Sequence, residues 1–134
     1  MIYTSYYARF AKLPKAKDVV GLQVSNSCPK WLDARLVNMK ELAPNWGFVE
    51  RWKAGSITEE EFKRVYLQEL ECKVDKSEVV AKLLDLLDEH DDVVLLCYEK
   101  VGDVCHRHWL AEWLDIGIKE MPYNDWRLRC KHLA

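Results

Sequence analysis

The stretch that decides the fold is "DDVVLLCYEKVGDVCHRHWLAEWL", residues 91–114. Residues 93–98 are apolar without alternation, which is typical of a strand covered on both faces. A turn containing Gly102 follows, and apolar residues then recur at helical spacing over 105–116, before Gly117, which can end a helix. A buried strand that leads directly into a helix is the repeating unit of a parallel α/β sheet.

Two capping boxes upstream of this strand predict the starts of two helices. In each, a side chain that can cap a helix, Thr58 or Asp75, is followed three positions later by a glutamate, Glu61 or Glu78. The second helix has an apolar face made of Val79, Val80, Leu83, Leu84 and Leu87. Such a face predicts a helix that packs on the sheet.

The rest of the chain supplies the other elements. Residues 1–6 and 19–25 are rich in Val, Ile, Tyr and Thr and are predicted to be strands. Residues 26–44 have no clean period, and we interpret them as a long irregular loop, with a helix as the alternative. A short helix capped by Asn45 and a last strand over 118–121 complete the prediction.

This order of strands and helices predicts an α/β fold. Consecutive strand–helix–strand units give right-handed crossovers and hence a mainly parallel sheet. We expect a single three-layer domain over residues 1–134, in which helices flank a small sheet of about four strands.

The composition narrows the classes of function. The net charge of −2 argues against a general nucleic-acid-binding protein. No apolar run reaches the roughly 18 residues that span a bilayer, and the N-terminus lacks a signal-peptide pattern, so we expect a cytoplasmic protein. The five cysteines are then expected to be free thiols rather than a disulfide framework.

The turn after the buried strand is the predicted site, because ligands of open α/β sheets bind at the carboxyl ends of the strands. Tyr98 and Glu99 follow that strand directly. Ser5, Tyr6 and Ser25 end the first two predicted strands and are expected at the same edge. We predict that these five residues line a ligand pocket.

A helical-wheel projection orients the side chains after the turn. His106 falls on the apolar side of the helix and should point inward, whereas His108 falls on the opposite face and should meet solvent. Cys105 and Arg107 flank the apolar side. Asp103 is the expected N-cap, which would place Cys105 in the first turn, where free N–H groups favour a thiolate.

These positions suggest a division of roles. Cys105 would be the reactive thiol, His106 an acid or base, and Cys97 either a resolving thiol or a pocket wall. Arg107 would bind an anionic group of the ligand, and its loss should affect binding more than folding. Whether the two cysteines approach within the about 7 Å that a disulfide needs is left open.

Each role has a structural alternative. Cys97 can simply be a small core residue, His106 a hydrogen-bonded structural histidine, and Glu99 a solvated carboxylate. The spacing of cysteines and histidines matches no usual zinc pattern, so no metal site is expected.

The same stretch resembles the family called domain of unknown function 488. Members carry a strand that ends in Cys, then a Glu, a short turn, and "CHR" at the start of a helix, which matches Cys97, Glu99, Cys105, His106 and Arg107. The resemblance implies an α/β fold with this motif lining a pocket. The resemblance implies no particular reaction. The chain looks like a small subgroup of the family that is found in bacteria and their phages, which leaves a role in nucleotide or nucleic-acid metabolism open.

Three functions are compatible with the sequence. The first is a thiol-dependent enzyme acting on a compact anionic, nucleotide-like ligand. The second is a protein that binds or sequesters such a ligand without catalysis. The third is a macromolecular adaptor that uses some of the six tryptophans. The oligomeric state and any cofactor are not predicted.

Overall fold

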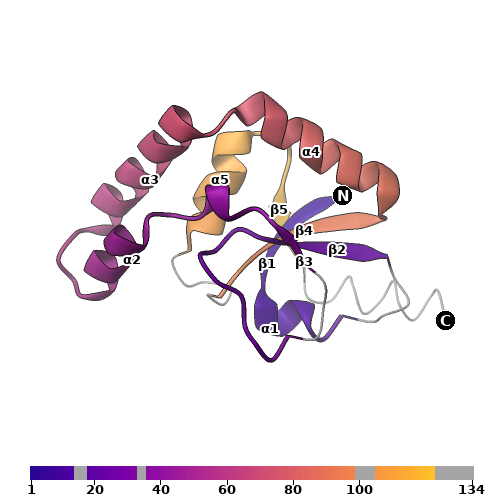
Figure 1. Cartoon of the computed structure of the whole chain (residues 1–134), viewed down its shortest axis with the longest axis horizontal. Helices are drawn as coiled ribbons and strands as arrows, with labels where there is room; N and C mark the ends of the chain where they lie inside the picture. The colour runs from indigo at the N-terminus through magenta and orange to yellow at the C-terminus, as the bar shows by residue number, and fades with distance from the viewer. Residues whose placement is uncertain (14–17, 33–35, 99–104, 123–134) are drawn as a thin grey trace.

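The computed structural model describes residues 1–13, 18–32, 36–98 and 105–122, and its strands form one parallel sheet (Figure 1). The sheet has five strands in the order β3-β2-β4-β1-β5. Their bounds are Ile2–Tyr6 for β1, Val19–Gln23 for β2, Leu36–Asn38 for β3, Asp92–Cys97 for β4 and Lys119–Glu120 for β5. The predicted α/β fold is confirmed, with five strands where about four were expected.

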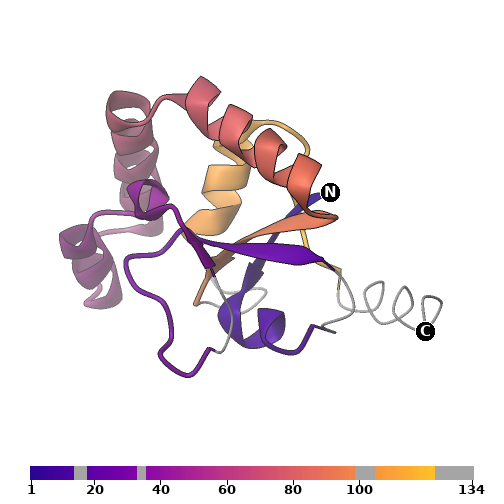
Figure 2. The ribbon, with the colours of Figure 1, turned by 45° about the vertical axis from the view of Figure 1, so that its right-hand side comes forward.

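The helices cover the two faces of the sheet unequally. Their bounds are Tyr7–Phe10 for α1, Trp46–Lys53 for α2, Glu59–Lys73 for α3, Lys76–Glu89 for α4 and His106–Leu114 for α5, with a 3-10 helix, η1, over Lys40–Leu42. Helices α3, α4 and α5 lie on one side of the sheet, and the short α1 lies on the other (Figures 1 and 2). No helix in the described ranges is long and apolar enough to cross a bilayer.

Strand β4 lies at the centre of the sheet, as its continuous apolar run predicts. All six of its residues are buried, and the strand pairs with β1 on one side and β2 on the other. Val93 and Leu95 pack in the larger core, towards α3, α4 and α5. Val94 and Leu96 pack in the smaller core, towards α1. The continuous apolar run therefore supplies both cores.

The helix starts agree with the capping residues in the sequence. Asn45, Thr58 and Asp75 each accept a hydrogen bond from a backbone N–H two or three residues further on, at 2.9 to 3.1 Å. Each such bond satisfies one of the amide groups that a helix start leaves unpaired. These caps fix where α2, α3 and α4 begin.

Two predictions about helix faces and ends are wrong. Leu84, which was assigned to the apolar face of α4, is 52% exposed, and Leu86 packs against the core instead. Helix α5 begins one residue later than expected, because Cys105 rather than Asp103 is the N-cap. It ends at Leu114, since Asp115 adopts a left-handed conformation with φ of 50°.

The predicted loop over 26–44 is also partly wrong, because it contains β3 and η1. Strand β3 pairs with β2 next to Gly21. A Cβ added at Gly21 would lie 2.8 Å from side-chain atoms of both Leu36 and Leu96. Glycine therefore allows the side chains of the two neighbouring strands to meet over β2. The predicted turn at Gly102 lies outside the described residues.

Candidate functional site

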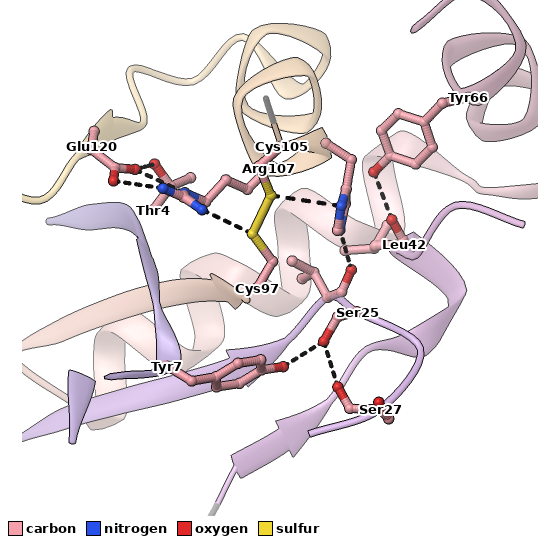
Figure 3. Close-up of a disulfide and its surroundings, with 12 residues drawn as sticks. Thr4, Tyr7, Ser25, Ser27, Leu42, Tyr66, Cys97, Cys105, Arg107 and Glu120 are labelled. Carbon is pink, nitrogen blue, oxygen red and sulfur yellow. Dashed lines mark hydrogen bonds and ion pairs between the residues drawn. A yellow bond between two sulfur atoms is a disulfide. The ribbon is translucent and has the colours of Figure 1, made fainter. Parts of the chain in front are cut away.

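The two cysteines at the predicted site are joined by a disulfide (Figure 3). Cys97 ends β4 and Cys105 caps α5. Their Cα atoms are 7.5 Å apart, slightly more than the about 7 Å taken above as the limit for pairing. Both residues are buried. The expectation of free thiols is therefore wrong for this pair, whereas Cys28 and Cys72 are free and exposed.

His106 points inward, as predicted, and its two ring nitrogens have different partners. Nε2 lies 2.6 Å from the carbonyl oxygen of Val24, which can only accept, so Nε2 carries the hydrogen. Nδ1 then presents its lone pair to Cys105 Sγ at 3.8 Å. Burial lowers the pKa of His106 to about 4, so the imidazole is neutral at pH 7.

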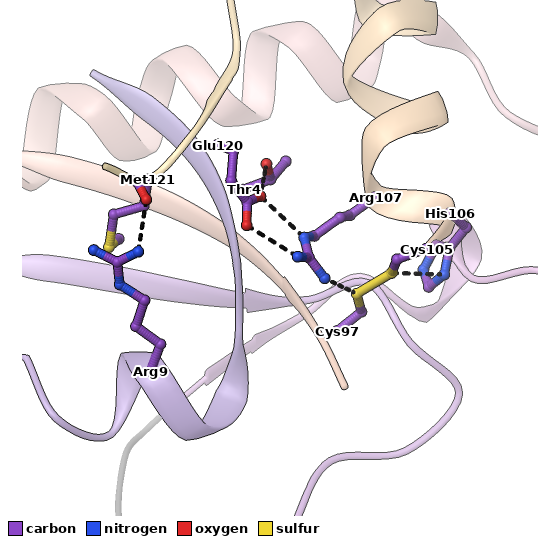
Figure 4. A network of polar contacts seen from close by, with 8 residues as sticks. All are labelled: Thr4, Arg9, Cys97, Cys105, His106, Arg107, Glu120 and Met121. Atoms are coloured by element: carbon purple, nitrogen blue, oxygen red, sulfur yellow. Dashed lines mark hydrogen bonds and ion pairs between the residues drawn. A yellow bond between two sulfur atoms is a disulfide. The ribbon is translucent and has the colours of Figure 1, made fainter. Parts of the chain in front are cut away.

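Arg107 is fully buried, not at the accessible edge expected from the wheel. Its guanidinium points towards Glu120 and Cys97 (Figure 4). Its Nε and Nη2 donate to the two carboxylate oxygens of Glu120 at 3.0 and 2.9 Å, and its Nη1 donates to Cys97 Sγ at 2.9 Å. Thr4 also donates to Glu120, at 2.6 Å. The burial corrects the expectation that Arg107 matters little for folding, and these contacts add no support to its predicted role as an anion clamp.

A pocket of about 280 Å³ adjoins the Cys105–His106 pair. Its described lining consists of Ser25, Asn26, Ser27, Pro44, Trp46, Val49, Trp52, Lys53, Phe62, Tyr98, Cys105 and His106. The residues come from α2, α3, the start of α5 and the segments after β2, η1 and β4. The pocket thus lies at the carboxyl ends of the strands, as expected for this fold.

Aromatic side chains and one lysine give this pocket its character. Trp52 and Phe62 stack with ring centroids 5.9 Å apart. Lys53 Nζ lies 5.8 Å from the centroid of the Trp46 ring, which is itself more than half exposed. None of the described lining residues is acidic. The pocket therefore combines flat apolar surfaces with a local positive charge.

The other predicted pocket residues are distributed unevenly. Ser25 and Tyr98 line the pocket. Ser5 is fully buried and Tyr6 is half-buried, and neither is among the described lining residues. Glu99 lies outside the described residues. His108, expected in solvent, is only partly exposed.

The contribution of α2 to the pocket was missed, although the sequence contains a signal for it. Trp46, Val49 and Lys53 are spaced i, i+3 and i+7, which puts them on one face of a helix. That spacing could have identified a face with two apolar residues and a cation. Only the fold shows that the face borders Cys105 and His106.

One group of side chains in the described part of the chain could hold a metal ion. Cys97, Cys105 and His106 are all buried, and each places a ligand atom within 4.8 Å of those of the others.

Comparisons with known proteins agree with the motif around Cys105. The model of the family DUF488-N3a, described as "Active DUF488-N3 subclade", matches residues 6–116. The matched region includes β2, β4, the aromatic pocket, the Cys97–Cys105 disulfide and α5. No curated protein and no solved structure matched this chain. The chain therefore belongs to the domain of unknown function 488 family.

Proposed function

We propose that this protein is a thiol-dependent enzyme in which Cys105 attacks a compact, anionic, nucleotide-like ligand bound in the aromatic pocket. The observation that carries the proposal is the contact between Cys105 Sγ and His106 Nδ1 at the wall of that pocket. A nucleophilic thiol needs a hydrogen-bond acceptor within reach and access to the ligand, and Cys105 has both.

Each cysteine has its own activating group in the reduced protein. His106 Nδ1 accepts the hydrogen of the Cys105 thiol, because its other nitrogen is held by the Val24 carbonyl. Arg107 Nη1 donates to Cys97 Sγ, and a cationic donor favours the thiolate form of a cysteine. Cys105 lines the pocket and is therefore the cysteine placed to attack the ligand, and Cys97, which is not among the described lining residues, is placed to resolve.

The reaction has two balanced steps. The Cys105 sulfur forms a bond to an electrophilic sulfur or oxygen atom of the ligand, and the leaving group departs with the electron pair of its broken bond. The Cys97 thiolate then attacks Cys105 Sγ and displaces the ligand as an anion, which leaves the disulfide in place. The ligand gains two electrons from the two thiols, and an external dithiol restores the thiols.

The lining of the pocket supports the class of ligand. Planar rings stack on indole faces, and Trp46, which lines the pocket and is more than half exposed, supplies such a face. Lys53 supplies positive charge for a phosphate or carboxylate. The volume of about 280 Å³ is at the small end of ligand sites, which favours a compact molecule.

Residue-resolved alkylation of the reduced protein, with a metal chelator present, tests the reactive thiol. At about pH 6 ordinary thiols are almost fully protonated, and the neutral His106 Nδ1 can take the thiol hydrogen as Cys105 attacks, so Cys105 should react with iodoacetamide faster than the exposed Cys72. His106→Gln keeps a donor for the Val24 carbonyl but replaces the imidazole acceptor, and it should remove that advantage. Faster reaction of Cys28 or Cys72 in the wild type would contradict the role of Cys105.

Binding without catalysis is the second candidate, favoured by the low exposure of Cys97 and Cys105. It requires the same pocket and the same ligand class. Turnover of a bound ligand by the reduced protein, with formation of one disulfide per product, separates the enzyme from the binding protein.

A further inference from the structure

Two sulfur atoms and one imidazole nitrogen converge at the start of α5. The ligand atoms of Cys97, Cys105 and His106 lie within 4.8 Å of one another, and all three residues are buried. Zinc binds cysteine sulfur at about 2.3 Å and histidine nitrogen at about 2.0 Å, so the ligand atoms around one tetrahedral ion lie somewhat less than about 4 Å apart. The 3.8 Å between Cys105 Sγ and His106 Nδ1 already fits this arrangement.

The surrounding groups orient these three side chains as they would around a metal. His106 Nε2 donates to the Val24 carbonyl, which directs Nδ1 towards the sulfur atoms. Hydrogen bonding of the second ring nitrogen to a carbonyl is a regular feature of histidine ligands. Arg107 Nη1 donates to Cys97 Sγ and can partly offset the charge of a coordinated thiolate.

We propose that reduction of the Cys97–Cys105 disulfide creates a zinc site formed by these two cysteines and His106. Two thiolates with one imidazole are a donor set that zinc prefers and that magnesium and calcium do not. Three protein ligands leave one tetrahedral position for water or a ligand, as in catalytic zinc sites. Cys105 and His106 both line the pocket, so the site adjoins it.

Zinc and the disulfide exclude each other. A dithiol reductant breaks the S–S bond by giving two electrons and two protons, and it becomes a cyclic disulfide. Zinc then replaces the two thiol protons, which pass to solvent. The site goes beyond the proposed thiol reaction and does not depend on it, because it needs the two reduced cysteines and His106 but no electrophilic ligand. Zinc bound to Cys105 would compete with attack by this sulfur.

The unusual sequence spacing explains why no zinc site was expected. Seven residues separate Cys97 from Cys105, and His106 follows at once, unlike the short paired spacings of common zinc motifs. The ligands come together here because a strand end and a helix start meet at the edge of the sheet.

Cobalt titration of the reduced protein tests the site. After anaerobic reduction and removal of the reductant, Co²⁺ should bind with a thiolate-to-cobalt charge-transfer band and tetrahedral d–d absorption, and Zn²⁺ should displace it. The oxidised protein should show neither band. Cys105→Ser should lose the charge-transfer intensity of its own sulfur and bind much more weakly, whereas the matched control Cys72→Ser should behave as wild type.

A second measurement needs no variant and therefore does not depend on how the variants fold. Zinc should slow alkylation of Cys97 and Cys105 in the reduced wild type and leave Cys28 and Cys72 unaffected. Fully reduced wild type that binds no Co²⁺, or zinc that protects neither Cys97 nor Cys105, would overturn the proposal. The reactivity of Cys105 in chelator is a separate readout, so failure of the zinc site and failure of the thiol enzyme are distinguishable.

Discussion

Tyr7 donates its phenolic hydrogen to Ser25 Oγ across 2.6 Å, because the hydrogen of the Ser25 hydroxyl is already donated to the Ser27 carbonyl. Tyr7 follows β1 and is almost wholly buried, whereas Ser25 follows β2 and lines the pocket. The bond therefore connects a residue that lines the pocket, Ser25, to the residue that directly follows β1.

This bond predicts a loss of stability in alkali. Burial raises the pKa of Tyr7 to about 12 from its ordinary value of 10.0. Between these values the unfolded chain has lost the Tyr7 proton and the folded chain has kept it. The free energy of unfolding should therefore fall as pH rises, by up to about 1.4 kcal/mol per pH unit from this group. Urea unfolding at about pH 9 and about pH 11 should show that the free energy of unfolding falls less for Tyr7→Phe than for wild type. An equal fall in the two proteins would contradict the raised pKa of Tyr7.

Arg107→Ala should destabilise the fold strongly. Removing one partner of a buried ion pair costs about 3 to 5 kcal/mol, and the partly exposed Glu120 places this case near the lower value. The matched control is Lys63→Ala, which breaks the exposed pair with Glu112 and should cost about 0 to 1 kcal/mol. Chemical denaturation measures both. An Arg107→Ala variant as stable as wild type would contradict the structural role of the Arg107–Glu120 pair and favour the earlier prediction that Arg107 mainly contacts the ligand.

Leu110→Ala and Leu84→Ala form a second matched pair. Leu110 on α5 is fully buried, so its truncation should cost about 2 to 5 kcal/mol through the cavity that it leaves. Leu84 on α4 is 52% exposed, and its truncation should change stability by no more than about 0.5 kcal/mol. Thermal melts compare the two variants, and equal losses would show that Leu84 packs in the core after all.

Lys53→Ala should weaken binding of an anionic ligand without affecting the fold. Lys53 is exposed at the end of α2, and its charge faces the pocket beside Trp46. Titration with a nucleoside monophosphate, followed by tryptophan fluorescence, should give a weaker affinity for Lys53→Ala than for Lys63→Ala. For the matching nucleoside, which lacks the phosphate, Lys53→Ala and Lys63→Ala should have nearly equal affinities. If Lys53→Ala binds the monophosphate as tightly as wild type does, Lys53 does not contribute to ligand binding.

The parts of the fold that follow from local pattern were predictable. The apolar run of β4 and the caps Asn45, Thr58 and Asp75 act through neighbours in sequence, so they can be identified without a fold. Strand β3 has only three residues and exists through its pairing with β2, which no local pattern encodes. The site divides in the same way: the inward turn of His106 follows from helical periodicity, whereas the pairing of Arg107 with Glu120 requires β5 to lie beside β1.

The central place of β4 also constrains how the chain folds. Ile2 pairs with Val93, so β1 has no neighbour in the sheet until a strand from the last third of the chain is available. Contacts between such distant segments close large loops and slow folding relative to local contacts. During synthesis, β1 leaves the ribosome long before its first partner strand, and the helices α2 to α4 are made in the interval. The sheet edge that holds Cys97, Cys105 and the pocket is consequently completed late, when the final segments of the matched region are added.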